Sequence, residues 1–226
     1  MDSGQKSKAL LFHVAITMHG TEKWILQHSA IEEYAFRKAF EKIRDIIIYQ
    51  VNNKLRIVTF YVQESKNSVM MKVMQEELDK LLKESIIADN QVKLSFVGRW
   101  YALNNEIVET IKYAIDETKD YDNFFVNFCV NYSGQDEILE AVQLIARKVK
   151  ADKLDPELVT KEIIKESLFT SNMMPPDIII RNGSGKSLEG FLMWDSAHAH
   201  IYFSGKSFID ITAADIDAAI EDRKRS

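Results

Sequence analysis

Short apolar runs alternate with longer amphipathic stretches along most of this chain, and no other feature limits its possible folds as strongly. The runs are rich in β-branched and aromatic residues, and several are apolar at nearly every position, as in strands buried on both faces. This alternation predicts an α/β protein with a mostly parallel central sheet and helices on both of its faces. The predicted strands are 10–18, 55–63, 92–97, 123–131, 178–180 and 201–203, and the main predicted helices are 29–50, 67–85, 104–118, 133–150 and 215–225.

The chain has no linker rich in glycine, serine or proline, so we predict one domain over its 226 residues, with a polar tail at 1–8. No apolar run approaches the roughly 20 residues that a membrane span needs. The start of the chain is too polar for a signal peptide, so we expect a cytoplasmic protein with no transmembrane segment. The net charge of −5 argues against a nucleic-acid partner.

Two turns are candidate ligand sites because ligands of parallel sheets bind beyond the carboxyl ends of the strands. The first turn, HGTEKW at 19–24, follows the first strand, and the second, NGSGKS at 182–187, follows the fifth. Arg181 and Lys186 add positive charge to the second turn, and an apolar helix is expected after it. Backbone N–H groups that converge in such turns favour an anion.

The second turn also looks like the end of a nucleotide-binding P-loop, with GSGKS at 183–187. That motif requires a glycine five residues before its Gly-Lys pair, and this position holds Ile180. The sequence therefore disfavours a nucleotide kinase.

Several ordered motifs between residues 13 and 203 resemble those of the cis-prenyltransferases, the undecaprenyl diphosphate synthase group. HVAITM at 13–18 is similar to the opening strand of that family, and NYSGQDEI at 131–138 to its Asn-Tyr-Gly-Gly-Arg-Asp-Glu-Ile signature. PDIIIR at 176–181, followed by FLMW at 191–194, resembles its closing signature. The resemblance implies a homodimer with a hydrophobic tunnel beside the sheet, which joins isopentenyl diphosphate to an allylic diphosphate with Mg²⁺.

The chain departs from this family at positions that the resemblance marks as functional. His19 stands where the family has an aspartate and His200 where it has a glutamate, the two carboxylates of the metal site. Mg²⁺ is poorly served by imidazole, so we expect the usual site to be lost, with a softer divalent metal on the two histidines as the alternative. Ser187 replaces an arginine, and Glu32 and Glu189 place negative charge where the family meets diphosphate.

Two functions remain open at this point. In the first, the chain is a divergent isoprenoid-processing enzyme that acts on a short prenyl diphosphate by unusual prenyl transfer or terpene cyclisation. His19 and His200 would then face each other at the tunnel mouth as general acid and base. Phe124 and Phe125 at the tunnel floor would limit the substrate to roughly ten to fifteen carbons. In the second, the chain is an inactive homologue that serves as a partner subunit of an active cis-prenyltransferase or binds a lipid.

The predicted partners are thus a prenyl diphosphate or short isoprenoid and a second subunit, either identical or an active cis-prenyltransferase. The metal stays unassigned. The predicted catalytic residues are His19, His200 and Asn67, and the predicted substrate-binding residues are Gly20, Lys23, Trp24, Arg181, Lys186, Ser187, Phe124 and Phe125.

Overall fold

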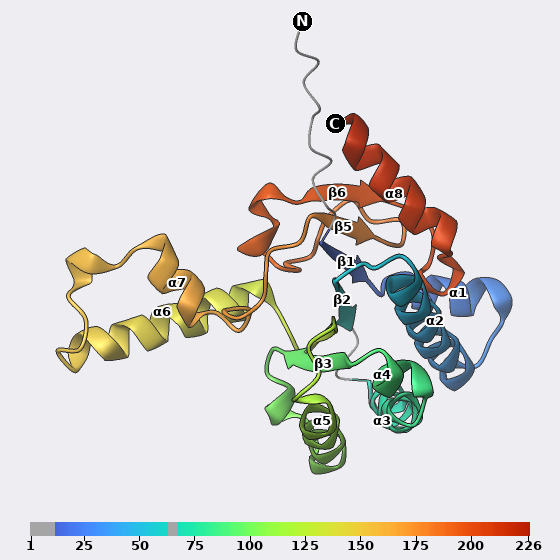
Figure 1. Ribbon diagram of the computed structural model, residues 1–226, viewed down its shortest axis with the longest axis horizontal. Helices are drawn as coiled ribbons and strands as arrows, with labels where there is room; N and C mark the ends of the chain where they lie inside the picture. The colour runs from blue at the N-terminus through green and yellow to red at the C-terminus, as the bar shows by residue number, and fades with distance from the viewer. Residues whose placement is uncertain (1–11, 63–66) are drawn as a thin grey trace, which may run out of the picture.

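A computed structural model describes residues 12–62 and 67–226 and contains a six-stranded sheet in the order β3-β4-β2-β1-β5-β6 (Figure 1). Every pairing in it is parallel, which confirms the predicted central sheet. Three parts of the predictions lie outside the described residues. They are the polar tail, the start of the first predicted strand at 10–11 and the end of the second predicted strand at 63. The strands are β1 (His13–Thr17), β2 (Ile57–Val62), β3 (Val92–Val97), β4 (Phe124–Val130), β5 (Ile178–Arg181) and β6 (His200–Phe203).

α-Helices lie in each connection between consecutive strands except that between β5 and β6, and those between β1 and β4 lie on one side of the sheet (Figure 1). Within the described residues, no helix combines the length and the apolar character needed to cross a bilayer. The α-helices are α1 (Thr21–His28), α2 (Glu32–Asn52), α3 (Ser68–Leu82), α4 (Ser85–Asp89), α5 (Asn105–Thr118), α6 (Gly134–Lys150), α7 (Lys161–Ser167) and α8 (Ala213–Arg225). Short 3-10 turns are η1 (Trp100–Ala102), η2 (Pro156–Leu158), η3 (Asp195–His198) and η4 (Phe208–Asp210).

The main core lies between one face of the sheet and α2, α3, α5 and α8. Because side chains alternate along a strand, every second residue enters this core, as Val58 and Phe60 do on β2. Phe60 stacks on Phe128 with ring centroids 5.7 Å apart, and Phe208 meets it edge-on at 6.2 Å. Burying each such ring stabilises the fold by about 1.5–3 kcal/mol.

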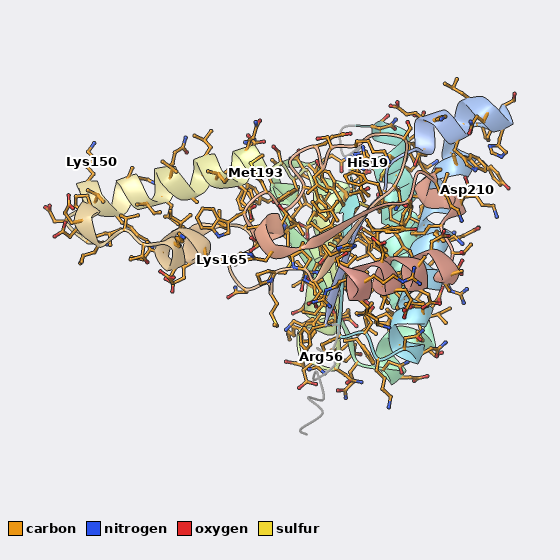
Figure 2. All side chains as sticks on the ribbon, turned by 90° about the horizontal axis from the view of Figure 1, so that it is seen from above. His19, Arg56, Lys150, Lys165, Met193 and Asp210 are labelled. Carbon is orange, nitrogen blue, oxygen red and sulfur yellow. The ribbon has the colours of Figure 1, made fainter. Side chains whose placement is uncertain are left out.

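The opposite face of the sheet has a much thinner cover. Tyr61 stacks on Phe191, from the connection between β5 and β6, with ring centroids 4.8 Å apart. The helices α6 and α7, which connect β4 to β5, form an arm that leaves the body of the molecule, and Lys150 lies near its tip (Figure 2). The prediction of helices on both faces is confirmed, although α6 contacts the segment on this side, at Gly190 and Met193, through its first residue and then leaves the body.

The base of the α6–α7 arm contains a buried polar network. The Tyr132 hydroxyl donates to Glu137 Oε2 at 2.5 Å, and the backbone N–H of Thr170 donates to Glu137 Oε1 at 2.9 Å. Burial raises the pKa of the Glu137 carboxyl. Lys165 Nζ bonds both carboxylate oxygens of Asp195, at 2.7 and 2.8 Å, so α7 is tied to the connection before β6.

The segment that follows the second turn does not form the predicted apolar helix. It makes a series of turns that end in η3. Glu189, Gly190 and Leu192 have φ values of 52°, 81° and 47°. Left-handed residues at such spacing interrupt a right-handed helix, which the apolar pattern alone did not reveal.

Candidate functional site

The two predicted turns meet at the carboxyl edge of the sheet because β1 and β5 are adjacent parallel strands. Asn182 joins them, since its backbone N–H donates to Thr17 Oγ1 at 3.0 Å and its side-chain amide donates to the Thr17 carbonyl at 2.8 Å. A Cβ added to Gly183 would lie 3.3 Å from His19 Cβ, so the turns are in direct contact. This edge is the candidate site.

Arg181 is the buried cation of the site, and its guanidinium is already engaged by the chain itself. Nη2 donates to Glu189 Oε1 at 2.6 Å, Nε donates to the Ser187 carbonyl at 2.7 Å, and Nη1 donates to the Asn182 carbonyl. Glu189 was expected only to repel a diphosphate, whereas the structure shows it as the counter-ion of Arg181. This pairing depends on the turn conformation between the two residues, which the sequence did not indicate.

His19 completes the cluster on the other oxygen of Glu189, with Nε2 at 3.0 Å from Oε2. Because a carboxylate can only accept, Nε2 carries a proton. Nδ1 is buried and has no hydrogen-bond partner among the described residues. Burial and the Arg181 charge lower the pKa of His19, although Glu189 opposes them, so the neutral ring presents a bare Nδ1.

The turn after β1 is covered by the segment that follows β6. Gly20 has a φ of 95°, and a Cβ on it would lie 2.9 Å from Ser207 Cα, so only glycine fits this close approach. Trp24 is buried, and its indole N–H donates to Asp210 Oδ1 at 3.0 Å, which anchors α1 on η4. Lys23 is exposed on α1.

Two further predicted binding residues shape the turn after β5. Lys186 Nζ lies over the Phe203 ring, 5.1 Å from its centroid. Ser187 Oγ accepts the backbone N–H of Glu189 at 3.1 Å and so helps to hold the carboxylate on Arg181.

His200 does not join this cluster. It is the first residue of β6 and pairs with Ile178, which pairs with Val14 near the start of β1. His19 lies beyond the other end of β1, five residues after Val14 and thus about 16 Å further along the strand direction at roughly 3.3 Å per residue. The prediction that the two imidazoles face each other, as an acid–base pair or around one metal, is therefore wrong within a single chain. His200 Nε2 instead lies 2.9 Å from Asp222 Oδ2 on α8.

Asn67, predicted as catalytic, lies at the N-cap of α3. Its Oδ1 accepts the backbone N–H groups of Val69 and Met70 at 2.9 and 3.0 Å, and its Nδ2 donates to Glu32 Oε1 at 2.5 Å. Oδ1 thus caps α3, and Nδ2 ties this cap to the first residue of α2.

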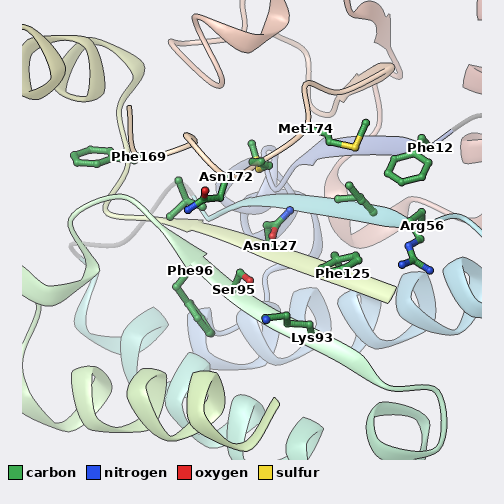
Figure 3. A pocket seen from close by; sticks show the side chains of 13 residues that line it. Phe12, Arg56, Lys93, Ser95, Phe96, Phe125, Asn127, Phe169, Asn172 and Met174 are labelled. Atoms are coloured by element: carbon green, nitrogen blue, oxygen red, sulfur yellow. The ribbon is translucent and has the colours of Figure 1, made fainter. Parts of the chain in front are cut away.

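Phe124 and Phe125 do not line one tunnel floor, because successive strand residues point to opposite faces. Phe124 is buried in the main core. Phe125 lies on the other face, where it lines a pocket of about 530 Å³ together with Asn127 and Phe169 (Figure 3). A smaller cavity of about 160 Å³ lies between α2 and α3 and reaches Phe128. The tunnel itself stays a prediction.

Comparison with known proteins agrees with this architecture. A family model described as "Putative undecaprenyl diphosphate synthase" matches residues 17–226. The chain is 33% identical to a geranylgeranyl-diphosphate-specific tritrans,polycis-undecaprenyl-diphosphate synthase of Methanocaldococcus jannaschii, over 94% of this chain and 80% of that protein. It is 29% identical to an isoprenyl transferase of Oceanobacillus iheyensis, over 86% of this chain and 79% of that protein.

Solved structures show the same fold. Lavandulyl diphosphate synthase from Lavandula x intermedia, in complex with dimethylallyl diphosphate, has a TM-score of 0.89 at 22% identity and 95% coverage of both chains. A probable undecaprenyl diphosphate synthase from Campylobacter jejuni has a TM-score of 0.74 at 21% identity and 96% coverage of both chains. With the extended sequence match, these findings show that the chain belongs to the undecaprenyl diphosphate synthase family of prenyltransferases.

Proposed function

We propose that this chain is a non-elongating member of its family that serves as a partner subunit of an active cis-prenyltransferase. One observation carries the proposal. Arg181, one of the predicted substrate-binding residues, is bound by three acceptors of its own chain, one of which is the Glu189 carboxylate. A diphosphate that approached Arg181 would first meet this negative charge.

The residues at the site do not fit the Mg²⁺ that the family implies. His19 offers an imidazole nitrogen where a hard cation prefers oxygen. Among residues 12–62 and 67–226, no cluster of three or more histidine, cysteine, aspartate or glutamate side chains is suited to hold a metal ion. No reaction step is therefore assigned to Mg²⁺ in this chain.

The α6–α7 arm supports a role in pairing. Leu139 and Val142, three residues apart on one face of α6, are each 53% exposed, and Leu158 between the two helices is 61% exposed. Apolar side chains gathered on a projecting element are typical of a surface that a partner covers. The partner is either a second copy of this chain or an active family member, and we favour the active member because this chain's own site is closed.

The test combines co-purification with an elongation assay. The chain alone, given isopentenyl diphosphate with geranyl or farnesyl diphosphate, should yield no product with Mg²⁺, Mn²⁺ or Zn²⁺. Co-expressed with an active synthase of its own organism, it should co-purify and raise product formation. The double variant Leu139→Glu/Val142→Glu should lose both effects, whereas Glu157→Gln in η2 should keep them. Elongation by the chain alone would overturn the proposal.

A second candidate is the divergent isoprenoid-processing enzyme, and the bare Nδ1 of His19 favours it. A neutral, buried imidazole nitrogen is suited to accept a proton from a prenyl group at the carboxyl edge of the sheet. Diphosphate release from geranyl diphosphate by the isolated chain, lost in His19→Asn, would support it. Absence of release with any of the three metals would exclude it.

A further inference from the structure

The cluster of Arg181, Glu189 and His19 is arranged as an anion site with its anion supplied by the chain. Nη2 of Arg181 and Nε2 of His19 each approach one oxygen of the same carboxylate, at 2.6 and 3.0 Å. These donors come from the ends of two different strands, and each forms a hydrogen bond with a different oxygen of the Glu189 carboxylate. A phosphate oxygen pair would present the same two acceptors to the same two donors.

Burial within the cluster is unequal. The Arg181 side chain is 3% exposed, whereas the Glu189 side chain is 41% exposed. The Arg181 guanidinium therefore lies in the interior, and the Glu189 carboxylate lies between it and the solvent. An anion from solution that replaced the carboxylate would need no rearrangement of β5.

The loop that carries Glu189 is fitted closely over the guanidinium. A Cβ on Gly185 would lie 2.6 Å from Arg181 Nη2, and one on Gly183 would lie 3.3 Å from Nη1, so glycines let the backbone pass. Glu189 itself has a φ of 52°, a conformation that costs a non-glycine residue free energy and is held here by the Ser187 hydroxyl. The carboxylate is thus placed on Arg181 at some conformational cost.

We propose that Glu189 is a tethered carboxylate that occupies a binding site for a free phosphate or diphosphate group on Arg181 and His19. The inference rests on the proposed function in taking the site of the isolated chain as closed. Tethering gives Glu189 an effective concentration of about millimolar or higher, so an untethered anion competes poorly while it is present. Without it, a buried guanidinium lacks a counter-ion, which is strongly unfavourable, and an anion from solution becomes the natural replacement.

The alternative is that Glu189 is a permanent structural counter-ion with no site beneath it. The two ideas agree that Glu189→Gln lowers stability. They differ on rescue, because only a real anion site lets an added anion restore what the substitution removed. If an anion binds at the site, the Tm of the variant rises with the concentration of that anion. If Glu189 is only a structural counter-ion, added anion leaves the Tm of the variant unchanged.

The probe is inorganic pyrophosphate without metal, added to the full chain and followed by thermal unfolding and calorimetric titration. Glu189→Gln should bind pyrophosphate at least tenfold more tightly than the natural chain does. Its Tm should fall and then rise by about 5 °C with saturating pyrophosphate, whereas that of the natural chain should stay unchanged. Inorganic phosphate, run in parallel, distinguishes a site for one phosphate group from a site for two.

Two controls make the result specific. Arg181→Met/Glu189→Gln removes both charges and should not bind pyrophosphate, and Glu140→Gln, which removes a half-buried carboxylate near Arg99, should behave as the natural chain. Should Glu189→Gln not fold, Glu189→Asp replaces it, because the shorter side chain cannot reach both donors. A Glu189 variant that gains no affinity, or a double variant that binds equally well, would overturn the proposal.

The assay uses neither a prenyl substrate nor a partner chain, so its failure leaves the partner-subunit role standing. Conversely, a chain that fails to pair with an active synthase could still gain pyrophosphate binding on substitution of Glu189.

Discussion

His13 and His19 stand at the two ends of β1, and both rings are buried, yet their surroundings differ. His13 Nδ1 lies 2.7 Å from the Met174 carbonyl, and its Nε2 lies 2.7 Å from Thr59 Oγ1. His19 has a partner for Nε2, whereas its buried Nδ1 has none within the described part of the chain. A buried histidine with hydrogen-bond partners for both ring nitrogens serves the structure. One that keeps an unpaired ring nitrogen at the carboxyl edge of the sheet can still accept a hydrogen bond or a proton from a ligand.

The largest expected effect comes from removing the satisfied histidine. His13→Ala should destabilise the fold by about 3 kcal/mol, because it leaves a cavity between β1 and β2 and deprives the Met174 carbonyl and Thr59 of a partner. Denaturant unfolding measures the loss. A change below about 1 kcal/mol would contradict the structural role assigned to His13.

The pH dependence of stability separates the two ends next. Burial lowers the pKa of His13 from 6.5 to about 4. The stability that a neutral buried histidine contributes is complete above pH 6.5 and is lost as the pH falls toward 4, where the loss reaches about 3 kcal/mol. Unfolding free energies between pH 7 and pH 4 should show this slope, and His13→Gln should reduce it. Equal slopes in both proteins would show that His13 does not titrate in this way.

Gly20 tests the close approach at the carboxyl end of β1. Gly20→Ala should cost about 2 kcal/mol, because φ is left-handed and the added methyl group meets the Ser207 backbone. Gly205→Ala is the matched control, since its φ is 71° but a Cβ would meet nothing within 4 Å, so about 1 kcal/mol is expected. Equal losses in the two variants would mean that Ser207 does not press on Gly20.

The smallest effect is expected at the unsatisfied histidine. His19→Gln should change the unfolding free energy by less than about 1 kcal/mol, because its amide takes the place of the imidazole Nε2 and can still donate to Glu189, and no partner of Nδ1 is lost. Thermal unfolding checks this. A loss as large as that of His13→Ala would erase the distinction between the two ends.

Much of the fold follows from local pattern. Runs such as FFVNFCV in β4 are short, β-branched or aromatic, and separated by helical periodicity, and these properties suffice for a parallel sheet. The direction of parallel strands also separates His19 from His200, since one follows β1 and the other begins β6. That separation was available from the sequence once both strands were placed.

The pairing at the site could not be predicted in this way. Arg181 meets Glu189 because the backbone between them turns through glycines and a left-handed glutamate. Helical periodicity in the apolar residues after this turn suggested a helix, and a helix would have carried Glu189 elsewhere. Conformations that a few non-helical residues impose on long side chains are not encoded in hydrophobic spacing.

Gly190, the residue after Glu189, is in direct contact with the start of the arm. Gly190 accepts the backbone N–H of Gly134, the first residue of α6, at 3.1 Å, and a Cβ on Gly134 would lie 2.6 Å from Met193 Cβ. The first residue of α6 is therefore hydrogen-bonded to the residue that directly follows Glu189.

A helix of 17 residues is about 25 Å long, so a rotation of about 10° at its first residue carries its tip through about 4 Å. Through the hydrogen bond between Gly134 and Gly190, a partner that moved α6 would act on the segment that carries Glu189. We therefore expect the binding of a partner to the arm and the binding of an anion to Arg181 to affect each other.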